Sequence, residues 1–203
     1  MIARYHDPAH EEKRNKHINI IKQAVHNLTN ILNEFLSLDR MEEGGIVCHP
    51  STFSLVKFVS ELVDEKHILY EQEQRIIYTH KGKTDLIRLD KDILRNILIN
   101  LLSNAMKYSS IDKKIYLTTE LKDKILTIVI QDSGIGIPQA DQKHLFERFF
   151  RAQNALTIQG TGLGLNIIKK YLNLMGGSIH FKSQENIGTT FTVGIPYEKN
   201  STN

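Results

Sequence analysis

The sequence of 203 residues contains no tryptophan and a single cysteine, Cys48. One cysteine excludes an internal disulfide and is typical of a reducing compartment. A lone cysteine without a nearby activating group is usually inert, so we interpret Cys48 as structurally incidental.

A long hydrophobic run is also lacking. The longest, residues 97–102 (ILINLL), is far too short for a membrane span, which needs about 20 apolar residues. The N-terminus carries no basic segment followed by an apolar one, and so does not resemble a signal peptide. We therefore expect a cytoplasmic fragment.

The sequence also lacks a large excess of either positive or negative charge. The formal net charge is +3, and the basic residues are spread along the chain, which argues against a nucleic-acid partner. Hydrophobic residues make up 40% of the sequence and charged residues 24%, as in ordinary soluble proteins that bury a core. The length accommodates one ordinary domain plus a smaller part, or one large domain.

Residues 9–43 contain neither proline nor glycine, and the helix-breaking pair Gly44-Gly45 follows them. This pattern predicts one long helix of about 50 Å at 1.5 Å per residue. The helix could pack on its own domain, but its length and wide apolar stripe favour a helical bundle or a dimer. The stripe has three heptad columns: Ile18, Val25 and Leu32; Ile21, Leu28 and Phe35; Ala24, Ile31 and Leu38.

The second part, residues 50–196, mixes helical and strand patterns. Ser54 is expected to cap a helix over residues 55–70, with Phe53 and Phe58 as a hydrophobic staple. Without a regular strand–helix alternation, the pattern predicts a two-layer α+β sandwich. The other expected elements are strands 76–79 and 86–89, a helix from Asp90 to Tyr108, strands 115–121 and 125–131 with a hairpin turn at 122–124, a helix over 163–175 stopped by Gly176-Gly177, and strands 178–183 and 189–195.

Four polar residues share one face of the helix ending at Tyr108. Asn100, Asn104, Lys107 and Tyr108 are spaced i, i+4, i+7 and i+8 in an otherwise apolar helix. On these residues alone, the favoured interpretation is a pair of ordinary hydrogen-bonded or exposed asparagines, although asparagine is a poor helix former. The alternative is a metal and phosphate site, because a carboxamide oxygen ligates Mg²⁺ and a lysine neutralises phosphate.

Two glycine-rich segments follow strand-like and loop-like residues. Asp132 and the Gly134-x-Gly136 pair come directly after a strand, where backbone can approach a flat ligand and the carboxylate can accept from a base amino group; a plain turn is the alternative. Residues 160–165 (GTGLGL) open a helix, so their N–H groups can face an anion. Because residues 152–159 are loop-like rather than a strand, we exclude a dinucleotide-binding turn.

Between these segments lies FERFFR, residues 146–151. We interpret most of it as a short amphipathic helix packed by three phenylalanines. Arg148 and Arg151 are candidates to reach phosphate, because guanidinium groups suit phosphate oxygens. A segment of about twenty residues with aromatic anchors and few regular elements is expected to act as a lid.

In order, residues 100–109 (NLLSNAMKYS), 132–138 (DSGIGIP), 146–151 (FERFFR) and 160–165 (GTGLGL) resemble the N, G1, F and G2 boxes of sensor histidine kinases, and residues 188–191 (GTTF) resemble the last glycine motif. The resemblance implies an ATP-binding α/β sandwich of the GHKL or Bergerat type, with a mixed sheet covered by helices on one face. That fold is shared with type II topoisomerases and heat-shock chaperones.

Carried over residue by residue, the resemblance implies ATP and Mg²⁺ as cofactors. Asn104 would be the Mg²⁺ ligand, Asn100, Lys107 and Arg151 would serve catalysis, and Asp132 would hold the adenine amino group. Thr189 would support adenine through water. The implied nucleotide-binding set is Asn104, Lys107, Tyr108, Asp132, Gly134, Gly136, Ile137, Arg148, Gly160, Thr161, Gly162, Leu163 and Gly164.

The N-terminal helix, and especially residues 27–44 (NLTNILNEFLSLDRMEEG), resembles the second helix of the family's dimerisation and phosphoacceptor hairpin. We therefore expect two domains, a partial dimerisation helix at 1–47 and an ATP-binding catalytic domain at 48–203. The first hairpin helix, which would carry the acceptor histidine, is expected to be absent. His6, in His6-Asp7-Pro8, is interpreted as a loop histidine because proline follows too soon and no apolar helix comes after.

Three functions are weighed. The first is a kinase domain that transfers the γ-phosphoryl of Mg-ATP to a histidine, for relay to a response-regulator aspartate, in a homodimer whose parent is tied to the inner membrane only through upstream segments. The second is a GHKL-type ATP hydrolase; such enzymes carry a glutamate one helical turn before the metal asparagine, where this sequence has Asn100, a poor base. The third is a non-catalytic nucleotide-binding module.

Overall fold

The computed structural model describes residues 13–21, 25, 28–29, 32, 47–69 and 76–198. The chain divides into two compact units, Met1–Ile46 and Val47–Asn203. In the first unit the described residues are helical, while most of the helix predicted over 9–43, its Gly44-Gly45 end and His6 lie outside the described residues. Within the described ranges, no helix is both long and apolar enough to cross a bilayer.

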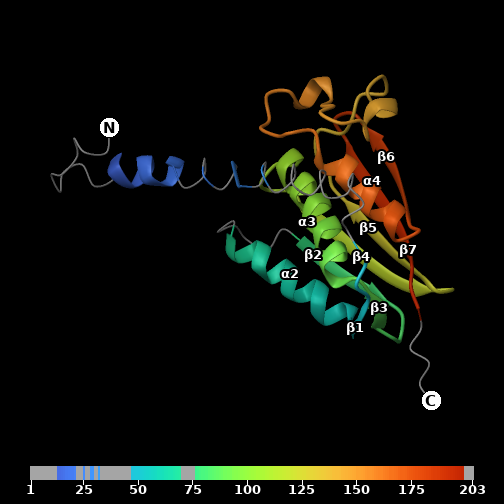
Figure 1. The fold of residues 1–203 in the computed structure, drawn as a ribbon. Coiled ribbons are helices and arrows are strands. Elements are labelled where there is room, and N and C mark those ends of the chain that lie inside the picture. Colours follow the sequence, from blue (N-terminus) through green and yellow to red (C-terminus); the bar gives the residue numbers. More distant parts are fainter. Residues whose placement is uncertain are drawn as a thin grey trace, which may run out of the picture. The chain divides into compact units, whose positions relative to one another are not determined.

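The second unit is built on a five-stranded mixed sheet in the order β2-β4-β5-β7-β6. Strand β2 pairs with β4 in parallel, and the other neighbours are antiparallel. Strands β1 and β3 form a separate antiparallel pair. Helices α2, α3 and α4 lie together over one face of the large sheet (Figure 1). The elements are β1 (Ser51–Ser54), α2 (Leu55–Leu69), β2 (Ile76–Lys81), β3 (Leu86–Leu89), α3 (Lys91–Tyr108), β4 (Ile115–Lys122), β5 (Ile125–Gln131), α4 (Gly164–Leu174), β6 (Ser178–Gln184) and β7 (Gly188–Pro196).

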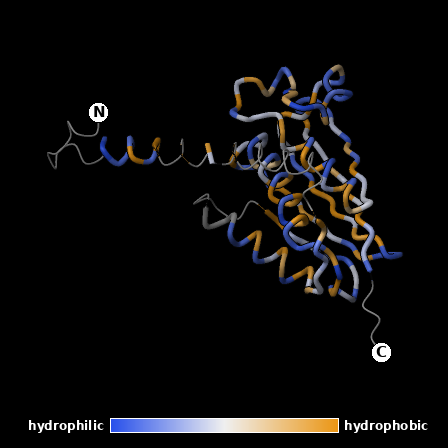
Figure 2. Tube along the Cα trace, viewed as in Figure 1, coloured by the Kyte–Doolittle hydropathy of each residue, from blue (hydrophilic) through white to orange (hydrophobic). Residues whose placement is uncertain are grey.

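The core lies between the helices and the sheet, and α3 runs through it. Seven apolar residues of α3 are buried, which fixes the rotation of this helix about its axis. Strands β4 and β5 alternate buried and less buried positions, so one face of these strands packs in the core. Figure 2 shows hydrophobic and hydrophilic positions alternating along α2 and α3. The buried residues of α3 are Ile93, Leu94, Ile97, Leu98, Leu101, Leu102 and Ala105.

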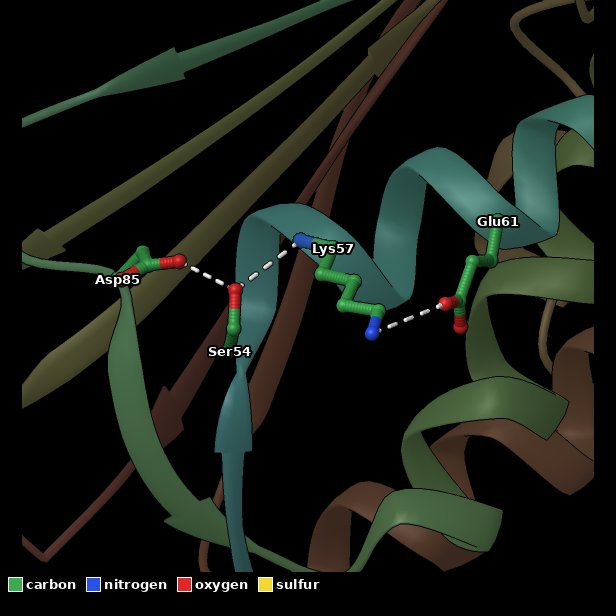
Figure 3. Close-up of polar contacts among 4 residues, drawn as sticks. All are labelled: Ser54, Lys57, Glu61 and Asp85. Carbon is green, nitrogen blue, oxygen red and sulfur yellow. Dashed lines mark hydrogen bonds and ion pairs between the residues drawn. The ribbon is translucent and has the colours of Figure 1, made fainter.

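The start of α2 confirms the predicted cap and staple. The Ser54 hydroxyl accepts a hydrogen bond from the Lys57 N–H at 3.1 Å and also bonds the Asp85 carboxylate (Figure 3). The rings of Phe53 and Phe58 pack edge to face at 5.2 Å. An exposed pair between Lys57 and Glu61, 4.0 Å apart, adds little. The cap therefore joins the end of β1 to the loop that precedes β3.

Other local signals in the sequence are confirmed at three places. Asp90 caps α3 by accepting from the N–H groups of Asp92 (3.0 Å) and Ile93 (2.9 Å). The turn between β4 and β5 has positive φ at its two central residues, 51° and 61°, as a tight hairpin requires. Helix α4 ends in a Schellman motif, because Gly176 (φ 65°) and Gly177 donate to the carbonyls of Asn173 and Leu172.

One prediction about local structure is wrong, and one strand was not predicted. Residues 146–151 form turns, not a short helix; the helical turns are instead the 3₁₀ segments η3 (Gln142–His144) and η4 (Gln153–Ala155), on either side. Phe149 has φ 61°, which interrupts any helix, and its side chain is exposed rather than packed. Strand β1 was not predicted, because its ladder depends on β3, some thirty-five residues further along the chain.

Candidate functional site

Asp132 follows β5 and is the polar centre of the candidate site. One oxygen of its carboxylate accepts from the N–H groups of Gly134 (2.9 Å) and Thr189 (3.2 Å), and the main-chain N–H of Asp132 donates to the Thr189 carbonyl at 2.9 Å. The residue is buried. The end of β5 and the start of β7 are thus joined at this aspartate, with its orientation fixed from both sides.

Burial raises the pKa of the Asp132 carboxyl above its ordinary value of 3.8, against the lowering effect of the hydrogen bonds from Gly134 and Thr189. Desolvation dominates because the ionised form loses more hydration than two N–H groups return. A carboxylate held this way can accept a further hydrogen bond from a ligand that carries its own donor. Sequence reasoning predicted this role for Asp132, and the geometry is compatible with it.

The turn after Asp132 lies against the end of α3. Ile135 donates its N–H to the Tyr108 carbonyl at 3.1 Å. A Cβ at Gly134 would fall 2.3 Å from that same oxygen, so no side chain fits there. Gly136 has φ 61°, and a Cβ there would fall 2.0 Å from the Gln184 carbonyl oxygen. The glycines of this turn therefore allow protein backbone to pack against protein backbone, whereas a close approach to a flat ligand stays a prediction.

The polar face of α3 contacts the second glycine-rich segment. A Cβ at Gly164 would fall 2.8 Å from the Asn100 Oδ1, and one at Gly160 would fall 2.2 Å from the Lys107 Nζ. Asn100 also donates its Nδ2 to the Asn96 carbonyl at 2.9 Å, a bond within the helix. Asn104 is half-buried on the same face. The structure thus brings together the two segments that are 50 to 60 positions apart in the chain.

Lys107 and Tyr108 form the rim of this face. The Lys107 ammonium lies 4.9 Å from the centre of the Tyr108 ring, a cation–π distance. Burial raises the pKa of the Tyr108 phenol, and the nearby charge of Arg151 lowers it in part. Since Arg151 is close enough to act on Tyr108, the segment between β5 and α4 reaches the end of α3.

Arg151 is engaged within its own segment. Its Nη2 donates to the carbonyls of Ala155 (2.6 Å) and Leu156 (3.0 Å) and also to that of Ile158. The guanidinium group therefore stabilises the loop that follows Arg151 in the chain. Arg148 is exposed on the preceding turn. A role for either arginine toward phosphate stays a prediction.

The start of α4 is shaped by close backbone contacts. Gly162 has φ 75°, and a Cβ there would fall 2.7 Å from both the Phe149 carbonyl carbon and the Phe150 oxygen. The Thr161 hydroxyl accepts from the Leu163 N–H at 3.2 Å, and Leu163 is buried. The glycine-rich segment and the FERFFR turns are thus packed against each other directly.

Several polar residues at the site were not predicted. Ser183 accepts from the Ile137 N–H at 2.9 Å and shares a 2.8 Å hydroxyl contact with Thr189, its partner across the β6–β7 ladder. Gln142 and Asn154 donate from the segment between β5 and α4 to the turn after Asp132. Ser183 could have been found from the pairing of strands 178–183 and 189–195, whereas nothing in the sequence singles out Gln142 or Asn154.

Among the described residues, no group of three or more histidine, cysteine, aspartate or glutamate side chains could hold a metal ion. A metal at this site would therefore need an amide oxygen such as that of Asn104, together with oxygens of a ligand or water. Mg²⁺ is commonly held in this way.

Known proteins share both sequence and fold with this chain. The circadian input-output histidine kinase CikA of Synechococcus elongatus is 33% identical over 190 residues, which cover 91% of this chain and 25% of CikA. Full-length ShkA in complex with AMPPNP superposes with a TM-score of 0.77 at 21% identity, over 92% of this chain and 39% of that one. The catalytic domain of histidine kinase ThkA, in a nucleotide-free form, gives a TM-score of 0.58 at 28% identity, over 73% of this chain and 97% of that domain.

The chain spans about a quarter of the length of the CikA sequence that it matches. The likeness to ShkA shows the fold. Residues 89–199, more than half of the chain, match the family described as histidine kinase-, DNA gyrase B-, and HSP90-like ATPases. The chain belongs to this family of ATPases.

Proposed function

We propose that this chain is the catalytic part of a sensor histidine kinase, which binds Mg-ATP and transfers its γ-phosphoryl group to a histidine on another helix. The observation that carries the proposal is the buried Asp132 carboxylate, oriented by two N–H groups at the end of β5 and joined through the Gly134 turn to the polar face of α3. The similarity to several histidine kinases supports this function over others in the family.

The adenine base would be recognised at Asp132. Its carboxylate has one oxygen occupied by main-chain donors, which leaves the other able to accept from an exocyclic amino group. Gly134 and Gly136 hold the turn close to the backbone of Tyr108 and Gln184, and the Ile137 side chain, which is half-buried, would pack against the base. Thr189 supports this end through its contacts with Asp132 and Ser183.

The phosphates would lie between the polar face of α3 and the glycine-rich start of α4. Asn104 would ligate Mg²⁺ and Lys107 would neutralise phosphate charge, with Tyr108 flanking the nucleotide. The N–H groups of residues 160–164 lie at the start of α4, where an anion is favoured, although that of Leu163 donates to the Thr161 hydroxyl. Bound Mg-ATP would supply the transferable phosphoryl group, while the protein positions it and balances its charge.

Arg148 and Arg151 would both reach phosphate from the segment between β5 and α4. Arg151 would have to leave three main-chain carbonyls that its Nη2 now contacts, so we propose that Arg151 also holds the loop.

The position before Asn104 favours transfer over hydrolysis. Asn100 lies one helical turn earlier, where a base would activate water, and its amide is not basic. Its Nδ2 donates to the Asn96 carbonyl, and its Oδ1 lies against Gly164. Asn100 would therefore join α3 to the start of α4 and leave water unactivated.

The first unit supplies the proposed dimer. In the part of this unit that the structure describes, five of the six apolar residues are exposed in the single chain, and Ile18 is half-buried. An apolar stripe of this length on a helix requires a covering surface. We propose that it forms a helical bundle with a second subunit in the intact protein, and that a response-regulator receiver domain takes the phosphoryl group. The exposed residues are Ile20, Ile21, Val25, Leu28 and Leu32.

The proposed function is tested by incubating the full chain with Mg²⁺ and ATP labelled in the γ-phosphate, and following the label. The expected result is labelled ATP that is bound and intact, and that becomes acid-labile label on a separately added phosphoacceptor hairpin from a related kinase. Release of free phosphate as the main product would identify a hydrolase instead. Absence of ATP binding would overturn the proposal altogether.

A further inference from the structure

The segment between β5 and α4 has few main-chain hydrogen bonds of its own. Residues 139–163 contain only the two short 3₁₀ turns, η3 and η4, within the described chain. Main-chain carbonyls near a buried turn need donors from elsewhere, because an unpaired buried polar group is costly. Three carboxamide side chains provide such donors, one before the FERFFR turns and two after them.

The first is Gln142. Its Nε2 donates to the carbonyls of Ile137 (3.0 Å) and Ser183 (3.1 Å). Ile137 ends the turn that begins at Asp132, and Ser183 is in β6. One side chain therefore fastens η3 both to that turn and to the sheet.

The second is Asn154. Its Nδ2 donates to the Gly136 carbonyl at 3.1 Å and lies 3.4 Å from the Ile135 carbonyl. Its Oδ1 is buried and has no hydrogen-bond partner in the structure. The side chain thus contacts the turn at its tightest point, and only its donor group is used. This pattern indicates that the N–H donor, rather than the acceptor, is what the position requires.

The third is Asn166, in the first turn of α4. Its Nδ2 donates to the Phe146 carbonyl at 2.9 Å, and its Oδ1 is likewise buried without a partner. The Phe146 ring packs at 5.9 Å on Phe181 of β6. The start of the FERFFR turns is therefore held by α4 and by the sheet at once.

We propose that Gln142, Asn154 and Asn166 are positioning residues, which hold residues 142–154 and their arginines against the Asp132 turn before a nucleotide binds. The proposal rests on the proposed function for the target of the arginines. A segment ordered in advance loses less conformational freedom when ATP binds. This smaller entropic cost raises the affinity for ATP. The segment would then act as a preformed wall of the site.

The test is hydrogen exchange on the full chain without nucleotide. Informative amides are those of Glu147 and Gln153, which bond the His144 carbonyl and the Asp141 carboxylate, at 2.9 and 2.8 Å. We expect them to be protected in the wild type. In Asn154→Ala their exchange should speed up about five- to tenfold, the effect of losing one or two hydrogen bonds. Amides of β5 should not change.

Two further variants distinguish the role of the Asn154 N–H donor from that of the shape of its side chain. Asn154→Asp keeps the volume but sets a carboxylate against two carbonyls, so it should loosen the segment at least as much as Asn154→Ala. Gln153→Ala, whose side chain is exposed on the same 3₁₀ turn, should exchange like the wild type. A role in packing alone predicts that Asn154→Asp rescues protection, and that result would overturn the proposal.

Ligand binding gives the second readout. Asn154→Ala should weaken ATP about fivefold and adenosine much less, because the base is held by Asp132 and the phosphates by the positioned segment. Equal loss for both ligands, or an unprotected segment in the wild type, contradicts the proposal. Because exchange is measured without nucleotide, failure of wild-type ATP binding would overturn the proposed function and leave the exchange result to be judged separately.

Discussion

The end of α3 and the segment between β5 and α4 contribute to the same site in different ways. In α3, seven buried apolar residues fix the helix against the sheet, so the directions of Asn104 and Lys107 follow from the core. The segment from 139 to 163 has two 3₁₀ turns, and its contacts with the rest of the site come from single side chains and from glycines with no room for a Cβ.

Because of this difference, substitutions in α3 and in the segment should have different effects. A substitution on the polar face of α3 should remove one function and leave the fold intact, because the buried face carries the stability. A substitution in the segment should change geometry first and ligand binding as a consequence. The comparison can therefore be broken by any variant of α3 that unfolds the segment, or by any variant of the segment that changes ligand binding without changing the conformation of the segment.

The largest effect is expected at the proposed metal ligand. Asn104→Ala removes a carboxamide oxygen, and Mg²⁺-dependent ATP binding should fall below detection while the melting temperature stays close to that of the wild type. Calorimetric titration with ATP, with and without Mg²⁺, measures this. The matched control is Asn96→Ala on the same helix, which loses only a 3.4 Å contact with the Tyr171 hydroxyl and should bind ATP normally. An unchanged affinity for Mg-ATP in Asn104→Ala would remove the metal assignment.

The next effect is expected at Asp132. Asp132→Asn should weaken adenine nucleotides by about tenfold or more, since an amide donates where the carboxylate accepts. It should leave an inorganic phosphate ligand unaffected. Equal losses for ADP and for a ligand that has phosphate but no base would contradict adenine recognition at this residue.

The raised pKa of Asp132 adds a pH dependence. ADP affinity should fall as the pH is lowered from neutral, beginning above the ordinary carboxyl value of 3.8, because protonation removes the acceptor. Without ligand, the free energy of unfolding depends on pH in the opposite direction. Between pH 3.8 and the raised pKa, Asp132 is more protonated in the native state than in the unfolded state. Its contribution to stability therefore decreases as the pH rises through that window. Asp132→Asn should show neither dependence, which a titration of ADP affinity and of melting temperature against pH would check.

A smaller effect separates strain from contact in the segment. Gly162 and Gly176 both have positive φ, 75° and 65°, so alanine at either should cost about 1 kcal/mol. A Cβ at Gly176 meets only the Pro196 Cγ at 4.0 Å, whereas one at Gly162 falls 2.7 Å from the backbone of Phe149 and Phe150. Gly162→Ala alone should therefore lower ATP affinity as well, by about tenfold if the segment shifts. Similar binding by both variants would mean that the close approach at Gly162 does not position the site.

Much of the fold could be predicted from local signals. The Ser54 and Asp90 caps, the turn at 122–124 and the Gly176-Gly177 stop each depend on residues close together in sequence, and all four are confirmed. Strand β1 was missed, since its partner lies far along the chain. The proposed helix over residues 146–151 was wrong, because Phe149 in the left-handed region leaves no pattern in the sequence.

The candidate site divides in the same way. Asn104 and Asp132 could be singled out because a polar residue in an apolar helix or after a strand stands out from its neighbours. Gln142 and Asn154 lie among polar loop residues, and the carbonyls that they contact belong to a turn defined only by the folded chain. Sequence patterns thus single out the residues proposed for direct chemistry more readily than the residues proposed to position them.

The smallest effect is expected at the start of α2, which has no part in the proposed chemistry. Ser54→Ala removes the acceptor for the Lys57 N–H and the contact with Asp85, and should lower the free energy of unfolding by about 1 kcal/mol. Ser60→Ala, the same change inside α2, should be neutral or slightly stabilising, because alanine favours a helix interior. Neither should alter ATP affinity, since the cap joins β1 to the loop before β3 and touches neither region of the site. If chemical denaturation shows the loss and titration shows weaker ATP binding too, then stability and site geometry are coupled through α2, and the separation drawn between α3 and the segment is incomplete.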